Sequence, residues 1–123
     1  MPVRILIVDD SSLVRNYVRT SIEQDPDWAV CGEAENGAIA LEMVVNLKPD
    51  LVSLDMSMPG MNGLETARRI SAISPGMPMI MFTMHDACIV EKEARGAGIQ
   101  HVFSKENGFG DKVFAAMKNM LTA

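Results

Sequence analysis

Apolar residues in this chain gather into five short runs, separated by stretches in which they are spaced more widely. Within a run nearly every position is apolar, a pattern typical of strands buried on both faces of a parallel sheet. The second run is weaker than the others because it contains a glycine. The five predicted strands are Val3–Val8, Trp28–Ala34, Asp50–Leu54, Met79–Thr83 and Ile99–Ser104.

Each run is followed by a stretch with apolar residues at helical spacing. The first helix is expected from Ser12 to about Asp25, with an apolar stripe of Val14, Tyr17, Val18 and Ile22 opposite Arg15 and Arg19. The second opens at Asn36 or Gly37 and stops at Lys48, the third carries Leu64, Ala67 and Ile70, the fourth spans about Asp86–Arg95, and the fifth carries Phe109, Val113, Ala116, Met117 and Met120. Strands alternating with helices predict an α/β fold, a doubly wound five-stranded parallel sheet with helices on both faces.

Length and charge narrow the class of protein. The 123 residues suit one domain over 1–123. A net charge of −5 gives the chain no electrostatic footprint for nucleic acid or for a membrane of anionic lipid. No apolar run approaches the roughly 18 residues that span a bilayer, and the acidic end of the first run is unlike a signal peptide. We therefore expect a cytoplasmic protein.

Polar residues stand where four of the five strands end. Asp9 and Asp10 follow the first strand, Asp55 the third, Thr83 closes the fourth, and Lys105 follows the fifth. Right-handed crossovers bring the carboxyl ends of parallel strands to one edge of the sheet. The sequence therefore predicts three carboxylates, a hydroxyl and an ammonium gathered at that edge, where ligands bind in open α/β sheets.

This combination predicts phosphoryl chemistry. Three close acids repel one another unless a cation is present, and Mg²⁺ binds to one or two carboxylates together with a phosphate. Asp55 could then act as a nucleophile toward phosphorus, while Thr83 and Lys105 stabilise the transferred group. Simpler explanations exist for each residue: Asp9, Asp10 and Thr83 could cap helices, and Lys105 could be a solvated surface lysine.

The segment after Asp55 contains Pro59, Gly60, Asn62 and Gly63, which cannot continue a strand. We expect this loop to end the third strand sharply enough to expose the Asp55 side chain.

In this order, the motifs resemble the receiver domain of two-component response regulators. They are Val8-Asp9-Asp10, Leu54-Asp55-Met56-Ser57-Met58-Pro59-Gly60-Met61-Asn62-Gly63, Phe82-Thr83 and Ser104-Lys105. The resemblance covers the whole chain and implies a flavodoxin-like (βα)5 receiver fold. It also implies that Asp55 accepts a phosphoryl group from a histidine kinase or phosphotransfer protein.

The resemblance further implies that Asp9, Asp10, Asp55 and the backbone carbonyl of Ser57 hold Mg²⁺, directly or through water. Phosphorylation would change binding to a downstream protein or to a fused effector domain absent from this chain. Such a domain promotes only its own phosphorylation and dephosphorylation, so we do not expect an enzyme in the metabolic sense.

Two positions depart from the family pattern, Val102 and Met84, and His85 follows the second of them. Val102 stands where receivers commonly have an aromatic residue, and strand alternation points the neighbouring Phe103 to the opposite face. Met84 follows Thr83 where a small residue is usual, and we expect it to screen the site. His85 is assigned only a modulating role.

Two other functions stay open at this stage. A degenerate receiver would bind a protein partner without phosphorylation, which the departures at Met84 and Val102 favour and the intact acidic set opposes. A Mg²⁺-dependent phosphohydrolase would typically need a second acid two residues after the nucleophile, where this chain has Ser57.

Overall fold

The computed structural model describes residues 2–84, 87–105 and 110–122. In this part of the chain five strands alternate with five helices, as the sequence pattern predicts. The elements are β1 (Val3–Val8), α1 (Ser12–Ile22), β2 (Trp28–Ala34), α2 (Gly37–Leu47), β3 (Leu51–Asp55), α3 (Gly63–Ile73), β4 (Met79–Thr83), α4 (Ala87–Gly96), β5 (His101–Ser104) and α5 (Asp111–Thr122).

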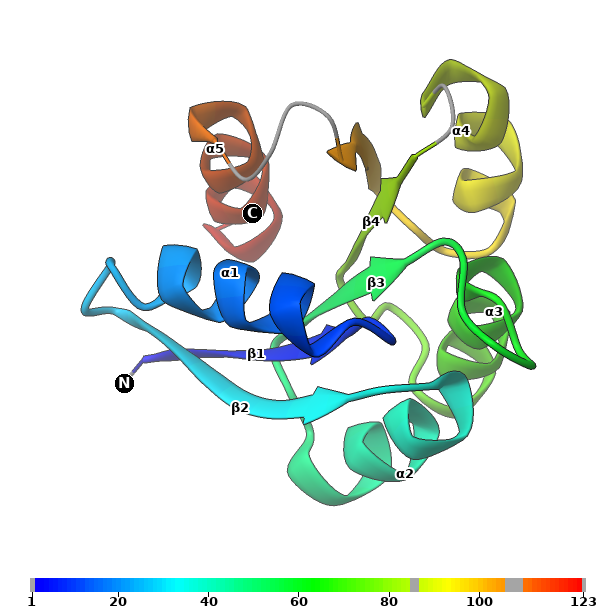
Figure 1. Ribbon diagram of the computed structural model, residues 1–123, viewed down its shortest axis with the longest axis horizontal. Helices are drawn as coiled ribbons and strands as arrows, with labels where there is room; N and C mark the ends of the chain where they lie inside the picture. The colour runs from blue at the N-terminus through cyan, green and yellow to red at the C-terminus, as the bar shows by residue number, and fades with distance from the viewer. Residues whose placement is uncertain (1, 85–86, 106–109, 123) are drawn as a thin grey trace.

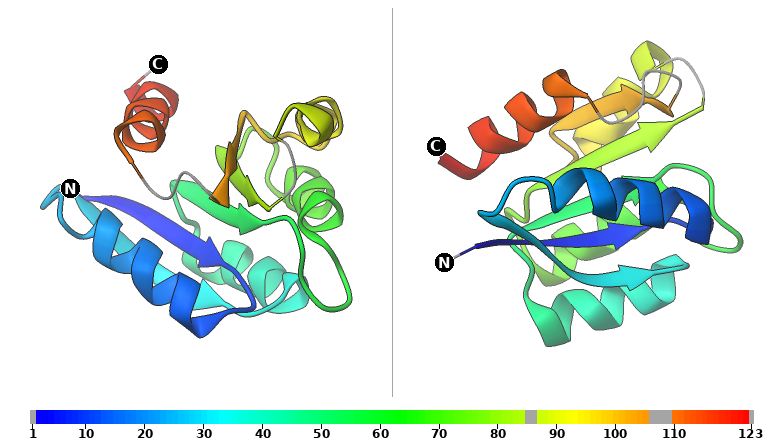
Figure 2. Two further views of the ribbon diagram at one scale, coloured as in Figure 1. Left: turned by 45° about the horizontal axis from the view of Figure 1, so that its top comes forward. Right: turned by 60° about the vertical axis from the view of Figure 1, so that its left-hand side comes forward.

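The strands form one parallel sheet in the order β2-β1-β3-β4-β5. Helices α1 and α5 cover one face, and α2, α3 and α4 cover the other (Figures 1 and 2). The predicted doubly wound α/β fold is therefore confirmed. The chain changes direction across the sheet between β1 and β3, and this switch point places the carboxyl ends of those two strands side by side.

Alternate residues of the central strands enter two separate cores. Leu6 and Val8 of β1 pack under α2, α3 and α4, whereas Ile5 and Ile7 pack toward α1 and α5. All of β3 and β4 is buried. Continuous apolar runs are required because a side chain on either face of a central strand is removed from water.

Two element boundaries differ from the prediction by more than one residue, and β3 spans Leu51–Asp55 rather than Asp50–Leu54. Helix α1 stops at Ile22 rather than near Asp25, because the main chain turns there and the Asp25 N–H donates to the Ile22 carbonyl at 3.2 Å. Strand β5 begins at His101 rather than Ile99, because the Ile99 N–H donates to the Ala94 carbonyl of α4 at 2.9 Å. Backbone groups that close a helix end are not available to a sheet.

The apolar stripe of α1 is narrower than predicted. Val18 and Ile22 are buried against the sheet, but Tyr17 is 53% exposed.

Across the described residues, every helix is too short or too polar to cross a lipid bilayer.

Candidate acidic phosphoacceptor site

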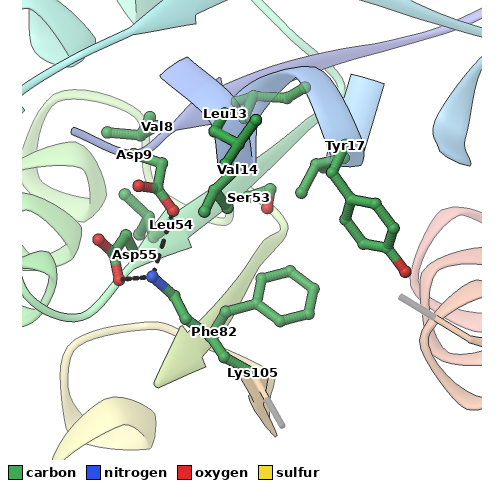
Figure 3. A pocket seen from close by; sticks show the side chains of 12 residues that line it. Val8, Asp9, Leu13, Val14, Tyr17, Ser53, Leu54, Asp55, Phe82 and Lys105 are labelled. Carbon is green, nitrogen blue, oxygen red and sulfur yellow. Dashed lines mark hydrogen bonds and ion pairs between the residues drawn. The ribbon is translucent and has the colours of Figure 1, made fainter. Parts of the chain in front are cut away.

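Side chains from three strand ends meet at the carboxyl edge of the sheet. The Lys105 Nζ lies 2.8 Å from Asp55 Oδ1 and 3.4 Å from Asp9 Oδ2. Figure 3 shows this ammonium between the two carboxylates, which extend from β1 and β3. Residues 46 and 50 positions apart in sequence thus share one ion-pair cluster because parallel strands end at the same edge.

Asp10 completes an acidic group with Asp9 and Asp55. One carboxylate oxygen from each of the three residues lies within 4.8 Å of the others. Asp9 and Asp55 are buried, whereas Asp10 is exposed to solvent. Carboxylate oxygens at this spacing, with an open side toward water, suit a hard divalent cation that keeps several of its own waters.

The pKa values in this cluster reflect an excess of negative charge. Burial is the main cause that raises the pKa of Asp55 above its ordinary value, and the charge of Asp9 adds to it, outweighing the hydrogen bond from Lys105. Burial alone would lower the pKa of Lys105, but its hydrogen bond and ion pair with Asp55, aided by Asp9, raise it. Lys105 therefore stays an ammonium, and one such charge does not fully compensate the carboxylates.

The loop after β3 holds Asp55 in place. The Met56 N–H donates to the Phe82 carbonyl of β4 at 3.0 Å, and the Gly63 N–H donates to the Met56 carbonyl at 2.8 Å. A Cβ on Gly63 would overlap the main-chain carbonyl oxygen of Asp55, so the close approach of α3 requires glycine there.

Our expectation that this loop exposes Asp55 is wrong: the residue is only 4% exposed. Its carboxylate forms part of the floor of a cavity of about 290 Å³, together with Asp9 and Lys105. Apolar side chains of α1 and Phe82 form the walls of the cavity, and Leu13, which is 80% exposed, lies at its rim (Figure 3).

Comparison with known proteins identifies the family. A family model described as the response regulator receiver domain matches residues 5–116. The chain belongs to this family. Receiver domains act as phosphoacceptors in two-component signalling and are generally not catalysts of a separate reaction.

Relatives and solved structures agree with the match. A protein-glutamate methylesterase/protein-glutamine glutaminase from a Nocardioides species is 39% identical over 110 residues, which are 88% of this chain and 30% of that protein. The nitrate/nitrite response regulator NarL of Escherichia coli K12 is 40% identical over 98 residues, 78% of this chain and 45% of NarL. The chain thus spans less than half the length of either relative.

The crystal structure of the response regulator domain of Thermotoga maritima CheB has a TM-score of 0.90 with this receiver domain. The two chains are 25% identical, and the comparison covers 100% of this chain and 98% of that one. The flavodoxin-like receiver fold is therefore confirmed.

The other predicted site residues of this receiver domain occupy different depths. Thr83 is fully buried at the end of β4, and Met84, the next residue, is 65% exposed. Ser57 is exposed, and its N–H donates to Asp55 Oδ1 at 3.4 Å. His85 lies outside the described residues.

Val102 and Phe103 point to opposite faces of β5, as strand alternation predicts. Val102 is half-buried and packs against the core under α2, α3 and α4. Phe103 packs against the core under α1 and α5, with its ring centroid 5.9 Å from that of Phe82. Phe103 therefore lies on the face that carries α1 and α5, opposite to Val102.

One contact to the acidic site was missed by sequence reasoning. Arg15 was placed opposite the apolar stripe of α1 and given no role, yet its Nη1 donates to the main-chain carbonyl of Asp9 at 2.6 Å. Its partner on the neighbouring strand is Glu33, and the ion pair joins Arg15 Nε to Glu33 Oε1 at 3.0 Å. An acid within a mostly apolar strand was the available signal, because such a residue usually needs a partner.

Proposed function

We propose that Asp55 of this receiver domain accepts a phosphoryl group from the phosphohistidine of a histidine kinase or phosphotransfer protein. An Asp55 carboxylate oxygen forms the new bond to phosphorus, while the bond from phosphorus to the donor nitrogen breaks and its electron pair stays on the nitrogen. The observation that carries the proposal is the position of the Lys105 ammonium, 2.8 Å from Asp55 and within the acidic group.

Asp9, Asp10 and Asp55, with the main-chain carbonyl of Ser57, would hold Mg²⁺ in this proposal. A bound divalent cation would offset negative charge on the carboxylates and on the phosphoryl oxygens. Lys105 would provide a second positive charge to those oxygens, and the Thr83 hydroxyl would donate a hydrogen bond. Three acids in one group support the metal assignment, since among the described residues the Lys105 ammonium does not fully compensate their negative charge.

We further propose that the output is changed binding to a downstream protein or to a fused effector domain. The phosphorylated form would favour a conformation already accessible to the free domain, through contacts that only the phosphoryl group supplies. Residues 1–123 would form one domain acting in the cytoplasm, without direct contact to nucleic acid or membrane. The domain would promote only the formation and the hydrolysis of its own acyl phosphate.

The test is phosphoryl labelling of the intact chain by acetyl phosphate and by a phosphorylated histidine kinase, each with Mg²⁺ and with excess chelator. We expect Mg²⁺-dependent incorporation that peptide mapping assigns to Asp55, and none in Asp55→Asn. Asp27→Asn is the matched control, because Asp27 is an exposed acid outside the acidic group, and it should label like the parent.

Labelling of Asp55→Asn at the parental level would overturn the assignment of the phosphoacceptor. If neither donor labels the parent chain, the degenerate receiver is the better account. The valine at position 102, with Phe103 on the opposite face, is the observation that favours that second function.

A further inference from the structure

A partly buried arginine connects helix α1 to the main chain of the acidic site. The Arg15 side chain is only 15% exposed, although arginine is rarely buried without partners. Its Nη1 donates to the Asp9 carbonyl at 2.6 Å and its Nε to Glu33 Oε1 at 3.0 Å. One planar guanidinium thus joins the residue after β1 to a residue of β2, and a fork of fixed geometry sets both distances together.

Every polar group of Asp9 takes part in a hydrogen bond or an ion pair. Its N–H donates to the Ala34 carbonyl of β2 at 3.0 Å, and its own carbonyl accepts from Arg15. Its carboxylate accepts the Ser11 N–H at 2.9 Å on Oδ1 and faces Lys105 with Oδ2. The Arg15 contact therefore belongs to a set of bonds that fixes where the Asp9 carboxylate points.

Glu33 anchors Arg15 and is itself fixed by a second arginine. Arg19 Nε lies 2.7 Å from Glu33 Oε2, so each carboxylate oxygen has its own guanidinium partner. Partial burial acts to raise the pKa of Glu33, but the hydrogen bonds from Arg19 and Arg15 outweigh it and lower the pKa. Glu33 is therefore an anion at neutral pH and can hold Arg15 against the back of the site.

The two arginines differ in one respect that a variant can isolate. Both pair with Glu33, but Arg15 also reaches the Asp9 carbonyl, whereas the second ion pair of Arg19 is with Glu23 at 3.6 Å. Glu23 stands just beyond the end of α1 and outside the acidic group. Removing either arginine deletes one positive charge and one bond to Glu33, but only Arg15 removes a bond to Asp9.

We propose that Arg15 is a positioning residue of the divalent-cation site: by fixing the Asp9 main chain against Glu33, it sets the affinity of the acidic group for the cation. This inference rests on the proposed function, because it takes Asp9 as a cation ligand. Partners that orient metal ligands without touching the metal typically change metal affinity by about 10- to 100-fold when they are lost.

Charge and position predict opposite effects for Arg15→Gln, so the sign of the result decides between them. Deleting a positive charge that contacts Asp9 of the acidic group should strengthen cation binding if simple electrostatics dominates. Loss of the Arg15 contact should weaken binding, because the Asp9 main chain can then shift and turn its carboxylate away from the other acids. Pairing of Arg15 with Glu33 reduces the electrostatic effect, and we therefore expect the positioning effect to win.

The experiment measures the dissociation constant for Mg²⁺ by isothermal titration calorimetry on the parent chain, Arg15→Gln and Arg19→Gln. Circular dichroism melts confirm that each protein is folded at the titration temperature. We expect Arg15→Gln to bind Mg²⁺ about tenfold more weakly and Arg19→Gln to stay within about twofold of the parent, since its contacts lie outside the site. Because each protein is folded at the titration temperature, a difference in Mg²⁺ affinity cannot come from global unfolding.

Parental or tighter Mg²⁺ affinity in Arg15→Gln, or an equal loss in Arg19→Gln, would overturn the proposal. If Arg15→Gln does not fold, Arg15→Lys replaces it. One ammonium cannot copy the two-acceptor fork, so we expect weaker Mg²⁺ binding than in the parent, and parental affinity would reject the inference. A parent chain that binds no Mg²⁺ would instead contradict the proposed cation site itself. Failure of the inference and failure of the proposed function are thus distinguishable.

Discussion

The floor and the rim of the cavity beside Asp55 are built from different kinds of residue. The floor consists of Asp9, Asp55 and Lys105, which are buried or nearly so and joined by ion pairs. The rim consists of exposed residues, among them Leu13 at 80%, and Met84 is similarly exposed beside the buried Thr83. The charged side chains of the floor are shielded from water, whereas Leu13 at the rim is exposed to it, which is the reverse of the usual distribution.

The floor and the rim should therefore have different roles: the floor residues take part in the reaction, and the rim residues affect which molecules reach it. Electrostatic interactions strengthen when they are removed from water, so substitutions in the floor should have large effects that do not depend on the donor. Exposed apolar side chains contribute little to stability, and their effects should be small and specific to what approaches the site. Each prediction below tests one part of this difference.

The largest effect is expected for Lys105→Ala. The substitution removes the ammonium that lies 2.8 Å from Asp55 Oδ1, and with it the positive charge available to a phosphoryl group on that oxygen. Loss of one such donor typically lowers a rate by about 10²- to 10³-fold. We expect Asp55 labelling by acetyl phosphate and by a kinase to fall by similar factors.

The control is Lys92→Ala, which deletes an exposed lysine on α4. It should label at the parental rate with both donors. If Lys105→Ala affects only one donor, Lys105 contributes to access rather than chemistry, and the separation between floor and rim fails.

A second prediction concerns stability against pH in Mg²⁺-free buffer. Because burial and Asp9 raise the pKa of Asp55 above its ordinary 3.8, the folded state binds this proton more tightly than the unfolded state. The resulting stability is fully present below pH 3.8 and is lost as pH rises through the folded-state pKa. At neutral pH the Asp55 anion is therefore a cost, and Asp55→Asn should unfold at a higher temperature than the parent.

Thermal unfolding by circular dichroism at a series of pH values checks this sign. The advantage of Asp55→Asn should shrink as the pH falls toward 3.8, and a difference of about 1 kcal/mol would shift the midpoint by roughly 3–6 °C. Asp27→Asn, at an exposed turn, should give no comparable difference. A parent chain more stable than Asp55→Asn at pH 7 would mean that the Lys105 ion pair outweighs the burial of the carboxylate.

The fold and most residues of the acidic site could be predicted from the sequence, because both follow from short-range patterns. Continuous apolar runs indicate buried parallel strands, and polar residues at the ends of those strands must converge once the crossovers share one hand. The positions of Asp9, Asp55 and Lys105 needed no knowledge of distant contacts. The start of β5 could not be predicted in this way, because the Ile99 N–H donates to the end of α4 instead of joining the sheet.

Burial and side-chain partners were harder to predict. We expected Asp55 to be exposed, but a loop can turn sharply and still leave a carboxylate at the floor of a cavity, because α1 and β4 supply walls from elsewhere in the chain. Arg15 was missed because its two partners come from β2 and from the end of β1. Helical spacing indicates which side of a helix is apolar, but it does not show what the polar side meets.

The smallest effect is expected for Met84→Ala, at an exposed apolar residue outside the lining of the cavity. Met84 is 65% exposed and directly follows the buried Thr83, and we predict that it screens the phosphoryl site without belonging to the floor. Shortening it should speed labelling by acetyl phosphate and hydrolysis of the acyl phosphate together, because both need access by a small molecule. We expect less than a tenfold change, a barrier difference below about 1.4 kcal/mol.

The control is Ile73→Ala, which shortens an exposed apolar side chain on α3 and should leave both rates unchanged. Equal labelling and hydrolysis rates in Met84→Ala and the parent would show that Met84 does not screen the site. A faster labelling rate with unchanged hydrolysis would instead limit its role to admission of the donor, because water is small enough to pass where acetyl phosphate is not.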